Sequence, residues 1–207
     1  MDIQFYGANC VVISYKSTRI VIDDNLDELG KKSIIKADDV ALFTNDEAAT
    51  SKGRLTFSGP GEYEVGDISV IGIEAKPFMN DDSGKKITMY KLIASDINVL
   101  VTGHILGELT SSQIEQIGPV DILLVPVGNN GYTLDPIGAL KLIKDIEPKI
   151  VVPTHYKQAG IKYPVEQIGL DSAVKDLGME IKDKVAKLKV KPIDLTDLTQ
   201  LIVIEAA

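Results

Sequence analysis

The distribution of short strands along this 207-residue chain constrains its fold more than any other feature. Up to about residue 100, short runs rich in β-branched and aromatic residues alternate with turn residues, which indicates consecutive strands. The runs cover residues 3–6, 11–15, 20–22, 40–44, 55–57, 63–65, 68–73, 87–93 and 97–101. The last two are separated by Ala94-Ser95-Asp96 and predict a hairpin.

Beyond residue 100 the sequence alternates between strands and helices. Residues 121–127 (DILLVPV) are a nearly unbroken apolar run, which is typical of a strand covered on both faces. Residues 149–152, 188–190 and 201–204 predict further strands. We therefore expect an α/β fold with two facing sheets and helices on their outer faces, in a single domain over residues 1–207.

Three helix starts are visible in the second half of the sequence. Thr110 and Gln113 have the spacing of a capping box, and Asp135-Pro136 combines an N-cap with proline at the first helical position. Asp171 predicts the cap of a helix over residues 172–177. In the second helix one apolar face is predicted from Ile137, Leu140, Ile143 and Ile146.

Charge and composition exclude several functional classes. The chain has 22 basic and 30 acidic residues, a net charge of −8, which disfavours a nucleic acid as partner. It lacks a secretory signal and any apolar stretch near the ~20 residues that span a membrane, so we expect a cytoplasmic protein without a membrane partner. Cys10 is the single cysteine, which excludes an intramolecular disulfide and a thiolate zinc cluster.

The chain contains two histidines, so a site built on three or more histidines is excluded. His104 and His155 each follow the end of a predicted strand, where ligand-binding groups gather in α/β sheets. A single histidine in such a place is more often structural. Two of them at two strand ends favour a shared cleft.

Two groups of acidic and amide residues are weaker candidates. Asp23 and Asp24 follow the strand 20–22 and could bind a metal or exchange protons, although carboxylates there are also common turn residues. Residues 45–47 (Asn-Asp-Glu) offer oxygen ligands to a hard cation but lack EF-hand spacing. A solvated loop is the default interpretation of residues 45–47.

Four stretches of the sequence resemble one known family. They are residues 6–10 (YGANC) with 20–23 (IVID), residues 58–65 (SGPGEYEV), residues 118–128 (GPVDILLVPVG) and residues 147–156 (EPKIVVPTHY). Together they resemble the metallo-β-lactamase-fold superfamily, in particular its short Zn-dependent-hydrolase-like branch. The resemblance runs over nearly the whole chain and implies a four-layer αββα sandwich with a metal cleft between the sheets.

The chain departs from the family at most of the metal ligands that the resemblance implies. The family's loop His-x-His-x-Asp-His, with further histidines and a bridging aspartate, holds two zinc ions. The residues that stand at these positions here are Ala8, Asn45, Glu47, Ala49, Thr50 and Asn80, with His104 in place of the aspartate. By the same resemblance His155 is a retained ligand, and Asp23 lies near the site.

The lost ligands predict a degenerate family member without hydrolase activity and without a cofactor. Such a protein would bind an unknown small molecule or protein, act as a scaffold, or form a homo-oligomer. The alternative is a metal-dependent hydrolase with a rebuilt single-zinc site formed by His104, His155 and one carboxylate from Asp23, Asp46 or Glu47. This alternative requires the histidine nitrogens within about 4.5 Å of each other, because Zn–N bonds are about 2.1 Å. An RNA-processing relative is disfavoured by the charge.

Overall fold

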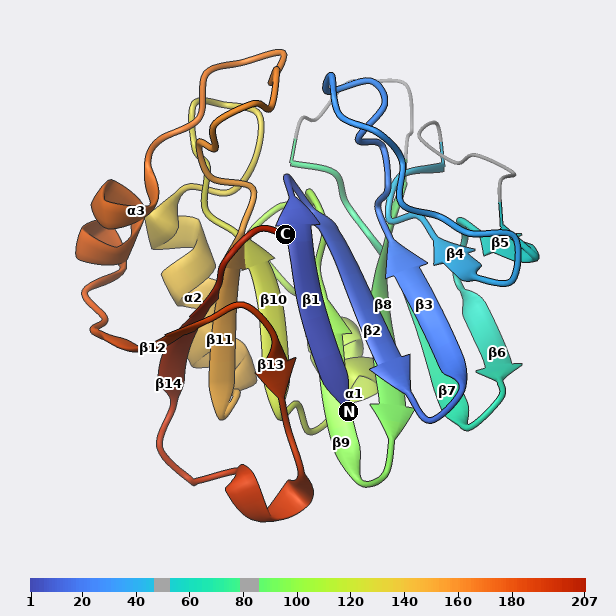
Figure 1. Cartoon of the computed structure of the whole chain (residues 1–207). Helices are drawn as coiled ribbons and strands as arrows, with labels where there is room; N and C mark the ends of the chain where they lie inside the picture. The colour runs from blue at the N-terminus through green and yellow to red at the C-terminus, as the bar shows by residue number, and fades with distance from the viewer. Residues whose placement is uncertain (47–52, 79–85) are drawn as a thin grey trace.

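The strands form two facing sheets, one of six and one of eight strands, in the computed structural model, which describes residues 1–46, 53–78 and 86–207 (Figure 1). The six-stranded sheet has the order β13-β1-β2-β3-β4-β5, formed by Leu188–Lys189, Asp2–Gly7, Cys10–Tyr15, Thr18–Ile22, Val40–Leu42 and Leu55–Phe57. The eight-stranded sheet has the order β12-β14-β11-β10-β9-β8-β7-β6, formed by Ile181–Val185, Gln200–Ile204, Ile150–Thr154, Ile122–Pro126, Ile97–Val101, Ile87–Ala94, Ile68–Ala75 and Gly61–Val65.

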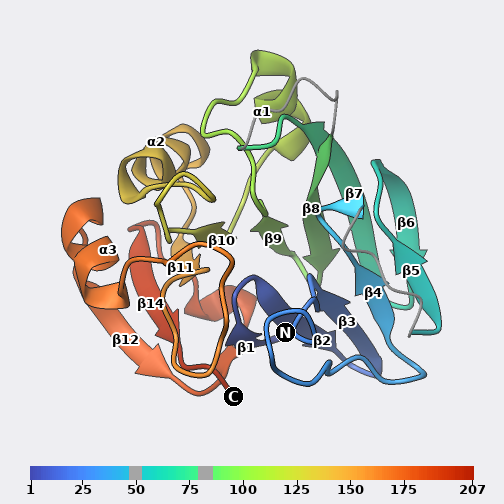
Figure 2. The ribbon, with the colours of Figure 1, turned by 90° about the horizontal axis from the view of Figure 1, so that it is seen from above.

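Different segments cover the outer faces of the two sheets. The helices α1 (Ser111–Ile117), α2 (Pro136–Ile146) and α3 (Leu170–Leu177) lie along the eight-stranded sheet, away from the six-stranded one (Figure 2). On the other side, the segment after β3 packs on the six-stranded sheet, where Leu26, Ile34 and Ile35 join a small apolar cluster with Cys10, Val12 and Val21. The α/β sandwich class predicted from the sequence is confirmed.

The main core lies between the sheets and continues under the helices. In β1 buried and half-buried residues alternate, as expected for a strand with one inward face. In β10 and β11 all residues are buried, because the core covers one face of these parallel strands and the helices cover the other. Each fully buried Leu or Ile contributes about 1.5–3 kcal/mol, so this layer holds the strand ends firmly in place.

Two of the three predicted helix starts are confirmed. The Thr110 side chain and Gln113 form the capping box, and Asp135 Oδ1 accepts a hydrogen bond of 2.6 Å from the Gly138 amide. The prediction for Asp171 is wrong, because α3 begins at Leu170 after Gly169. Asp171 lies in the first turn, where its charge still favours the helix dipole.

Two local patterns differ from the sequence expectation. Ile137 is 72% exposed, and the inward face of α2 consists of Ala139, Leu142 and Ile143. These residues have the same i, i+3, i+4 spacing, so the inward face was decided by which side packs on the sheet. The strand β12, which the sequence presents as a lysine-rich surface run, pairs with β14 at the sheet edge. Its Lys and Asp side chains point to solvent, which an edge strand permits.

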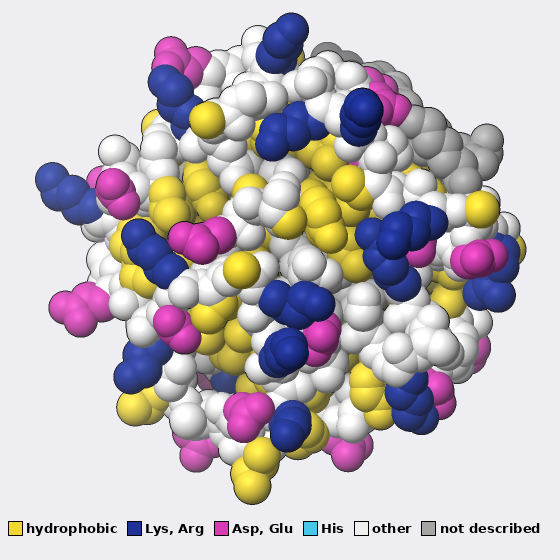
Figure 3. All heavy atoms as spheres, viewed as in Figure 1, with side chains coloured by type: hydrophobic (Ala, Val, Ile, Leu, Met, Phe, Trp, Pro, Cys, Tyr) yellow, Lys and Arg dark blue, Asp and Glu magenta, His cyan; other side chains and the backbone are white. Residues whose placement is uncertain are grey.

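The face of the molecule seen in Figure 1 has no patch of a single charge sign. On the face seen in Figure 1, basic and acidic side chains are interspersed, as Figure 3 shows. Within the described part of the chain, no helix is both long enough and apolar enough to cross a membrane.

Candidate metal site

The two histidines of the chain lie side by side at the ends of parallel strands. Neighbouring strands β9, β10 and β11 run in the same direction, and His104 and His155 follow β9 and β11. Their ring centroids are 4.5 Å apart with an interplanar angle of 82°, so one ring presents its edge to the other. The structure thus brings together the two histidines that the sequence places at strand ends, while their role as metal ligands stays a prediction.

The His155 ring is held in one orientation by Gln167. Gln167 Nε2 donates to the Val165 carbonyl at 2.7 Å, so its Oε1 is the atom that lies 3.2 Å from His155 Nδ1. An amide oxygen can only accept, and Nδ1 therefore carries the proton. The lone pair is left on Nε2, as in metal-binding histidines whose second nitrogen donates to an oxygen.

The backbone of His155 is also constrained. Its φ is +51°, a left-handed conformation that is uncommon for a residue with a side chain. Its amide donates to the Ala8 carbonyl at 2.7 Å, across to the other sheet. Such conformations persist where surrounding contacts enforce them, and they gather at functional sites.

Both histidines are neutral at neutral pH. Burial lowers the pKa of His104 to about 4, against a hydrogen bond with the Tyr132 backbone. Burial, followed by the nearby His104, lowers the pKa of His155 to about 3. His104 Nδ1 is buried and has no hydrogen-bond partner in the described structure. Neutral imidazole is the form that binds metals, and this orphaned nitrogen is a ready donor atom.

Asp23 lines a small pocket together with the two histidines and links the segments that follow β3 and β4. It follows β3 with a φ of +51°, and its two carboxylate oxygens accept from the Thr44 amide at 2.7 Å and the Thr44 hydroxyl at 2.8 Å. Burial raises the pKa of Asp23 to about 6, although both Thr44 bonds oppose the rise. Asp23 therefore positions the segment after β4 beside the histidines.

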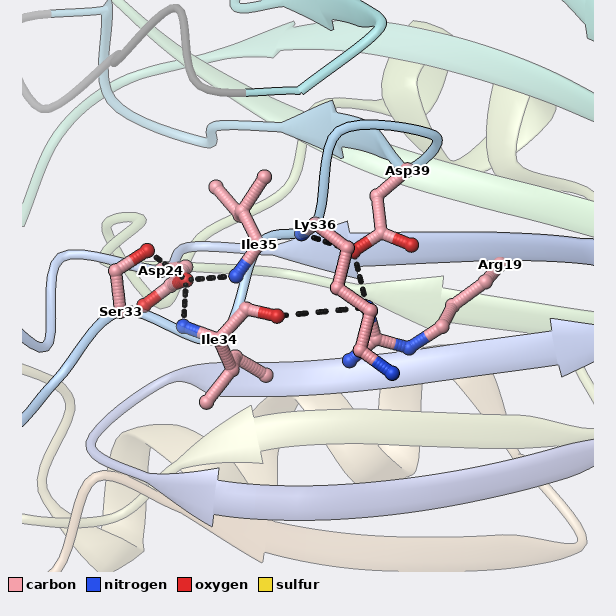
Figure 4. Close-up of polar contacts among 7 residues, drawn as sticks. All are labelled: Arg19, Asp24, Ser33, Ile34, Ile35, Lys36 and Asp39. Carbon is pink, nitrogen blue, oxygen red and sulfur yellow. Dashed lines mark hydrogen bonds and ion pairs between the residues drawn. The ribbon is translucent and has the colours of Figure 1, made fainter.

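Asp24, unlike Asp23, forms its hydrogen bonds outside the pocket. Its Oδ2 accepts from the Ser33 hydroxyl and from the amides of Ile34 and Ile35, at 2.7–2.9 Å (Figure 4). Arg19 and Asp39 form an ion pair at the other end of this network. The network secures the segment that covers the six-stranded sheet, and Asp24 is not part of the pocket lining.

A small pocket of about 50 Å³ opens beside the histidines. Its lining is formed by two imidazoles, one carboxylate, three amides, one hydroxyl and one phenol, namely His104, His155, Asp23, Asn9, Asn25, Asn45, Thr44 and Tyr132. The Tyr132 ring meets His104 edge-on at 5.1 Å. No lysine or arginine belongs to this described lining, so the polar groups that face a ligand are neutral apart from Asp23.

The other predicted ligands fall in three places. Asn45 lines the pocket, whereas Asp46 is exposed and accepts a hydrogen bond from the Ser58 hydroxyl. Ala8 is buried at the tip of the β1–β2 hairpin, where its carbonyl accepts the His155 amide. The remaining positions, Glu47, Ala49, Thr50 and Asn80, lie outside the described residues.

Five residues of this site were not predicted from the sequence, namely Asn9, Asn25, Thr44 and Tyr132 of the pocket lining, and Gln167. Asn9 lies in a stretch that carries the family resemblance but no separate chemical signal, and Tyr132 lies in a turn-rich segment without a chemical signal. Gln167 lies in a segment to which no element was assigned. A histidine at a strand end needs a hydrogen-bond partner for its second ring nitrogen, and this is the one signal that points to a residue such as Gln167. The sequence does not show which residue supplies that partner.

The described residues fit one metal ion better than two. They contain no set of three histidine, cysteine, aspartate or glutamate side chains close enough to hold an ion. Two adjacent neutral imidazoles, one with its proton fixed away from the pocket and one with an orphaned nitrogen, can still bind a single ion. The other donors would come from the pocket's oxygen atoms or from water.

The two facing sheets, with the histidines that follow β9 and β11 at one edge of a sheet, are the arrangement that the resemblance to the metallo-β-lactamase class of folds implies. Residues 2–155 match the family model described as the beta-lactamase superfamily domain, which is more than half of the 207 residues. The chain therefore belongs to the beta-lactamase superfamily domain family. This confirms the resemblance inferred from the sequence motifs.

Three relatives, each named a metal-dependent hydrolase, match different shares of the chain. A metal-dependent hydrolase of Lysinibacillus sphaericus is 28% identical, covering 81% of this chain and 88% of its own length. One from Staphylothermus marinus is 29% identical, covering 69% of this chain and 65% of its own. One from Carboxydothermus hydrogenoformans is 49% identical over 43 residues, 21% of this chain and 19% of its own. This chain thus spans less than two thirds of two of these three relatives.

A solved structure supports the fold independently. A candidate Zn-dependent hydrolase of the metallo-beta-lactamase superfamily from Thermotoga maritima superposes with a TM-score of 0.75 at 23% identity. The match covers 98% of this chain and 97% of that one. A metallo-hydrolase from Ignicoccus hospitalis has a TM-score of 0.64 at 14% identity, covering 99% and 95%. At these identities the likeness shows the fold alone.

The expectation of a degenerate binding or scaffolding protein without hydrolase activity is wrong. Relatives that match most of the chain are named metal-dependent hydrolases. These names include dependence on a metal, and the Thermotoga maritima protein is named for zinc, in contrast to the expectation that no cofactor is used. The error arose because lost ligands were counted by position along the sequence. That count could not show that His104 and His155 meet in neutral form.

Proposed function

We propose that this protein is a metal-dependent hydrolase with a single-ion site at His104 and His155. The observation that carries this proposal is the edge-to-face pair of neutral imidazoles at the wall of a polar pocket, with the His155 proton held by Gln167. The names of the relatives support it. The family's usual pair of ions finds less support, because most of the donor positions carry other residues.

At such a site some residues of the chain would bind the ion and others would position its ligands. His155 would offer Nε2 and His104 would offer Nδ1, while Gln167 keeps the His155 proton away from the pocket. Asp23 and Thr44 hold the third side of the pocket in place. A bound ion supplies Lewis-acid polarisation of the substrate and makes water nucleophilic at neutral pH.

Metal binding is the direct test. The protein is purified without chelators, its zinc content is measured by elemental analysis, and zinc affinity is measured by competition with a chromogenic chelator. We expect one zinc per wild-type chain and loss of tight binding in His104→Ala and His155→Ala. Cys10→Ala is the matched control, because Cys10 is the one thiol of the chain and is buried outside the pocket lining. Wild-type protein that binds no zinc, or histidine variants that bind as well as the control, would contradict the proposal.

A further inference from the structure

Asn9 presents an unsatisfied donor at the proposed site. Its side chain lines the pocket and is only 5% exposed. The Thr154 hydroxyl donates to Asn9 Oδ1 at 2.9 Å, which turns the amide so that Nδ2 faces away from Thr154. Within the described structure Nδ2 has no hydrogen-bond partner. The two N–H groups of Nδ2 therefore have no acceptor among the described residues, and they belong to a side chain that lines the same pocket as the two histidines.

Such an arrangement is costly unless a ligand uses it. A buried donor without a partner costs about 1–3 kcal/mol. The surrounding backbone nevertheless enforces the position, because Ala8 has a φ of +49° at the hairpin tip and its carbonyl accepts the His155 amide. The Ala8 amide in turn donates to Gln158 Oε1 at 3.1 Å. Asn9 is thus held rigidly at a fixed place relative to His155.

We propose that Asn9 is a catalytic residue of this site and that its Nδ2 donates to the carbonyl oxygen of an acyl substrate, an ester or an amide. This inference rests on the proposed hydrolase function. A fixed neutral donor stabilises an oxygen that gains negative charge during the reaction, because it needs no reorganisation when the charge develops. No lysine or arginine of the described lining competes for that oxygen.

The reaction step leaves Asn9 unchanged. A water oxygen adds to the carbonyl carbon, and the π electron pair moves to the carbonyl oxygen, where Nδ2 donates. When this pair re-forms the double bond, the bond to the leaving group breaks, and the proton lost by the water is taken up by the leaving group. Asn9 contributes hydrogen bonds only and transfers no proton.

Thr154 acts through Asn9 as a positioning residue. It is buried at the end of β11, and its hydroxyl is the group that holds Asn9 Oδ1. Thr154→Val keeps the side-chain volume but leaves the amide free to turn its oxygen toward the pocket. Thr154→Ser keeps the hydroxyl and should restore the wild-type behaviour.

A binding experiment tests the donor without reference to activity. Acetate, the acyl product of a simple ester, is titrated into ¹⁵N-labelled protein with and without zinc, and the side-chain amide signals are followed by NMR. The Asn9 signals are assigned by their absence in Asn9→Asp. We expect them to shift on acetate binding, while those of Asn98, which is paired with Asp121 away from the pocket, stay constant. Asn9 signals that do not respond in either form overturn the proposal.

A kinetic experiment separates this proposal from the proposed function. With 4-nitrophenyl acetate as probe, we expect Asn9→Ala to lower kcat by about 10²–10³-fold with zinc content unchanged. Thr154→Val should lower kcat in the same direction, and Thr154→Ser should rescue it. An active wild type with an equally active Asn9→Ala overturns the role of Asn9 alone. A wild type without zinc and without activity overturns the hydrolase proposal, and the acetate response of Asn9 then decides whether the donor binds an oxygen ligand.

Discussion

His104 and His155 meet edge to face with 4.5 Å between their ring centroids, although they follow different strands of the eight-stranded sheet. The parallel pairing of β9 with β10 and of β10 with β11 brings both strand ends to one edge. The site is completed by the tip of the β1–β2 hairpin from the other sheet, which binds the His155 backbone.

Gln167 should control zinc affinity through the His155 proton. Gln167→Leu removes the acceptor of Nδ1, and we expect zinc affinity to fall about 10–100-fold, the usual cost of losing such a partner. Gln167→Glu keeps an acceptor and should bind zinc at least as tightly as the wild type. Affinity is measured by competition with a chelator. Equal affinities in the Leu and Glu variants would show that Gln167 does not orient the ring.

Gly128 should be required for the packing around Gln167. A Cβ at this position would overlap Gln167 Oε1 and the His155 carbonyl oxygen. We expect Gly128→Ala to lower the free energy of unfolding by about 1–3 kcal/mol and to weaken zinc binding as well. Gly169→Ala is the control, because nothing lies within 4 Å of its added Cβ. Urea unfolding and zinc titration measure both effects, and a Gly128→Ala protein that matches the control contradicts the prediction.

The Thr44 hydroxyl should stabilise the buried Asp23 carboxylate. Thr44→Val preserves volume but leaves Asp23 Oδ2 without its donor, and we expect a loss of about 1.5–3 kcal/mol in the free energy of unfolding. Thr44→Ser keeps the hydroxyl and loses only a methyl group, so it should be the more stable variant. Urea midpoints compare the two. A more stable Val variant would mean that the hydroxyl bond contributes little.

Asp121 should make stability fall in acid. Burial by itself raises the pKa of Asp121, but the Asn98 amide and Lys149 outweigh burial and hold the pKa below the ordinary value. A carboxyl with a lowered folded-state pKa stabilises the fold above its unfolded pKa of about 3.9, and this contribution is lost as the pH falls through the folded pKa. We expect Asp121→Asn to cost about 1–3 kcal/mol at pH 7 and to flatten the acid limb of stability. Unfolding midpoints between neutral and acid pH give the comparison, and parallel wild-type and variant curves would refute the linkage.

Much of the fold could be predicted because its signals are local. An apolar run predicts the buried strand β10, and the pair Thr110 and Gln113 predicts the capping box. The turn before Ile97 predicts the β8–β9 hairpin. The sequence could not predict which face of α2 is buried, because Ala139 and Ile137 lie on different faces and each face has residues at helical spacing. Which stripe is buried depends on contacts with the sheet.

The sequence by itself determined the kind of fold, the family and the number of imidazoles that any site can use. Only the tertiary structure decided how these groups work together. It placed His104 against His155, directed the proton of His155 toward Gln167 and left Asn9 Nδ2 without a partner. The physical reason is that apolar patterns and turns act between near neighbours in the chain. Protonation, ring orientation and unmet hydrogen bonds depend on atoms that folding brings together from distant segments.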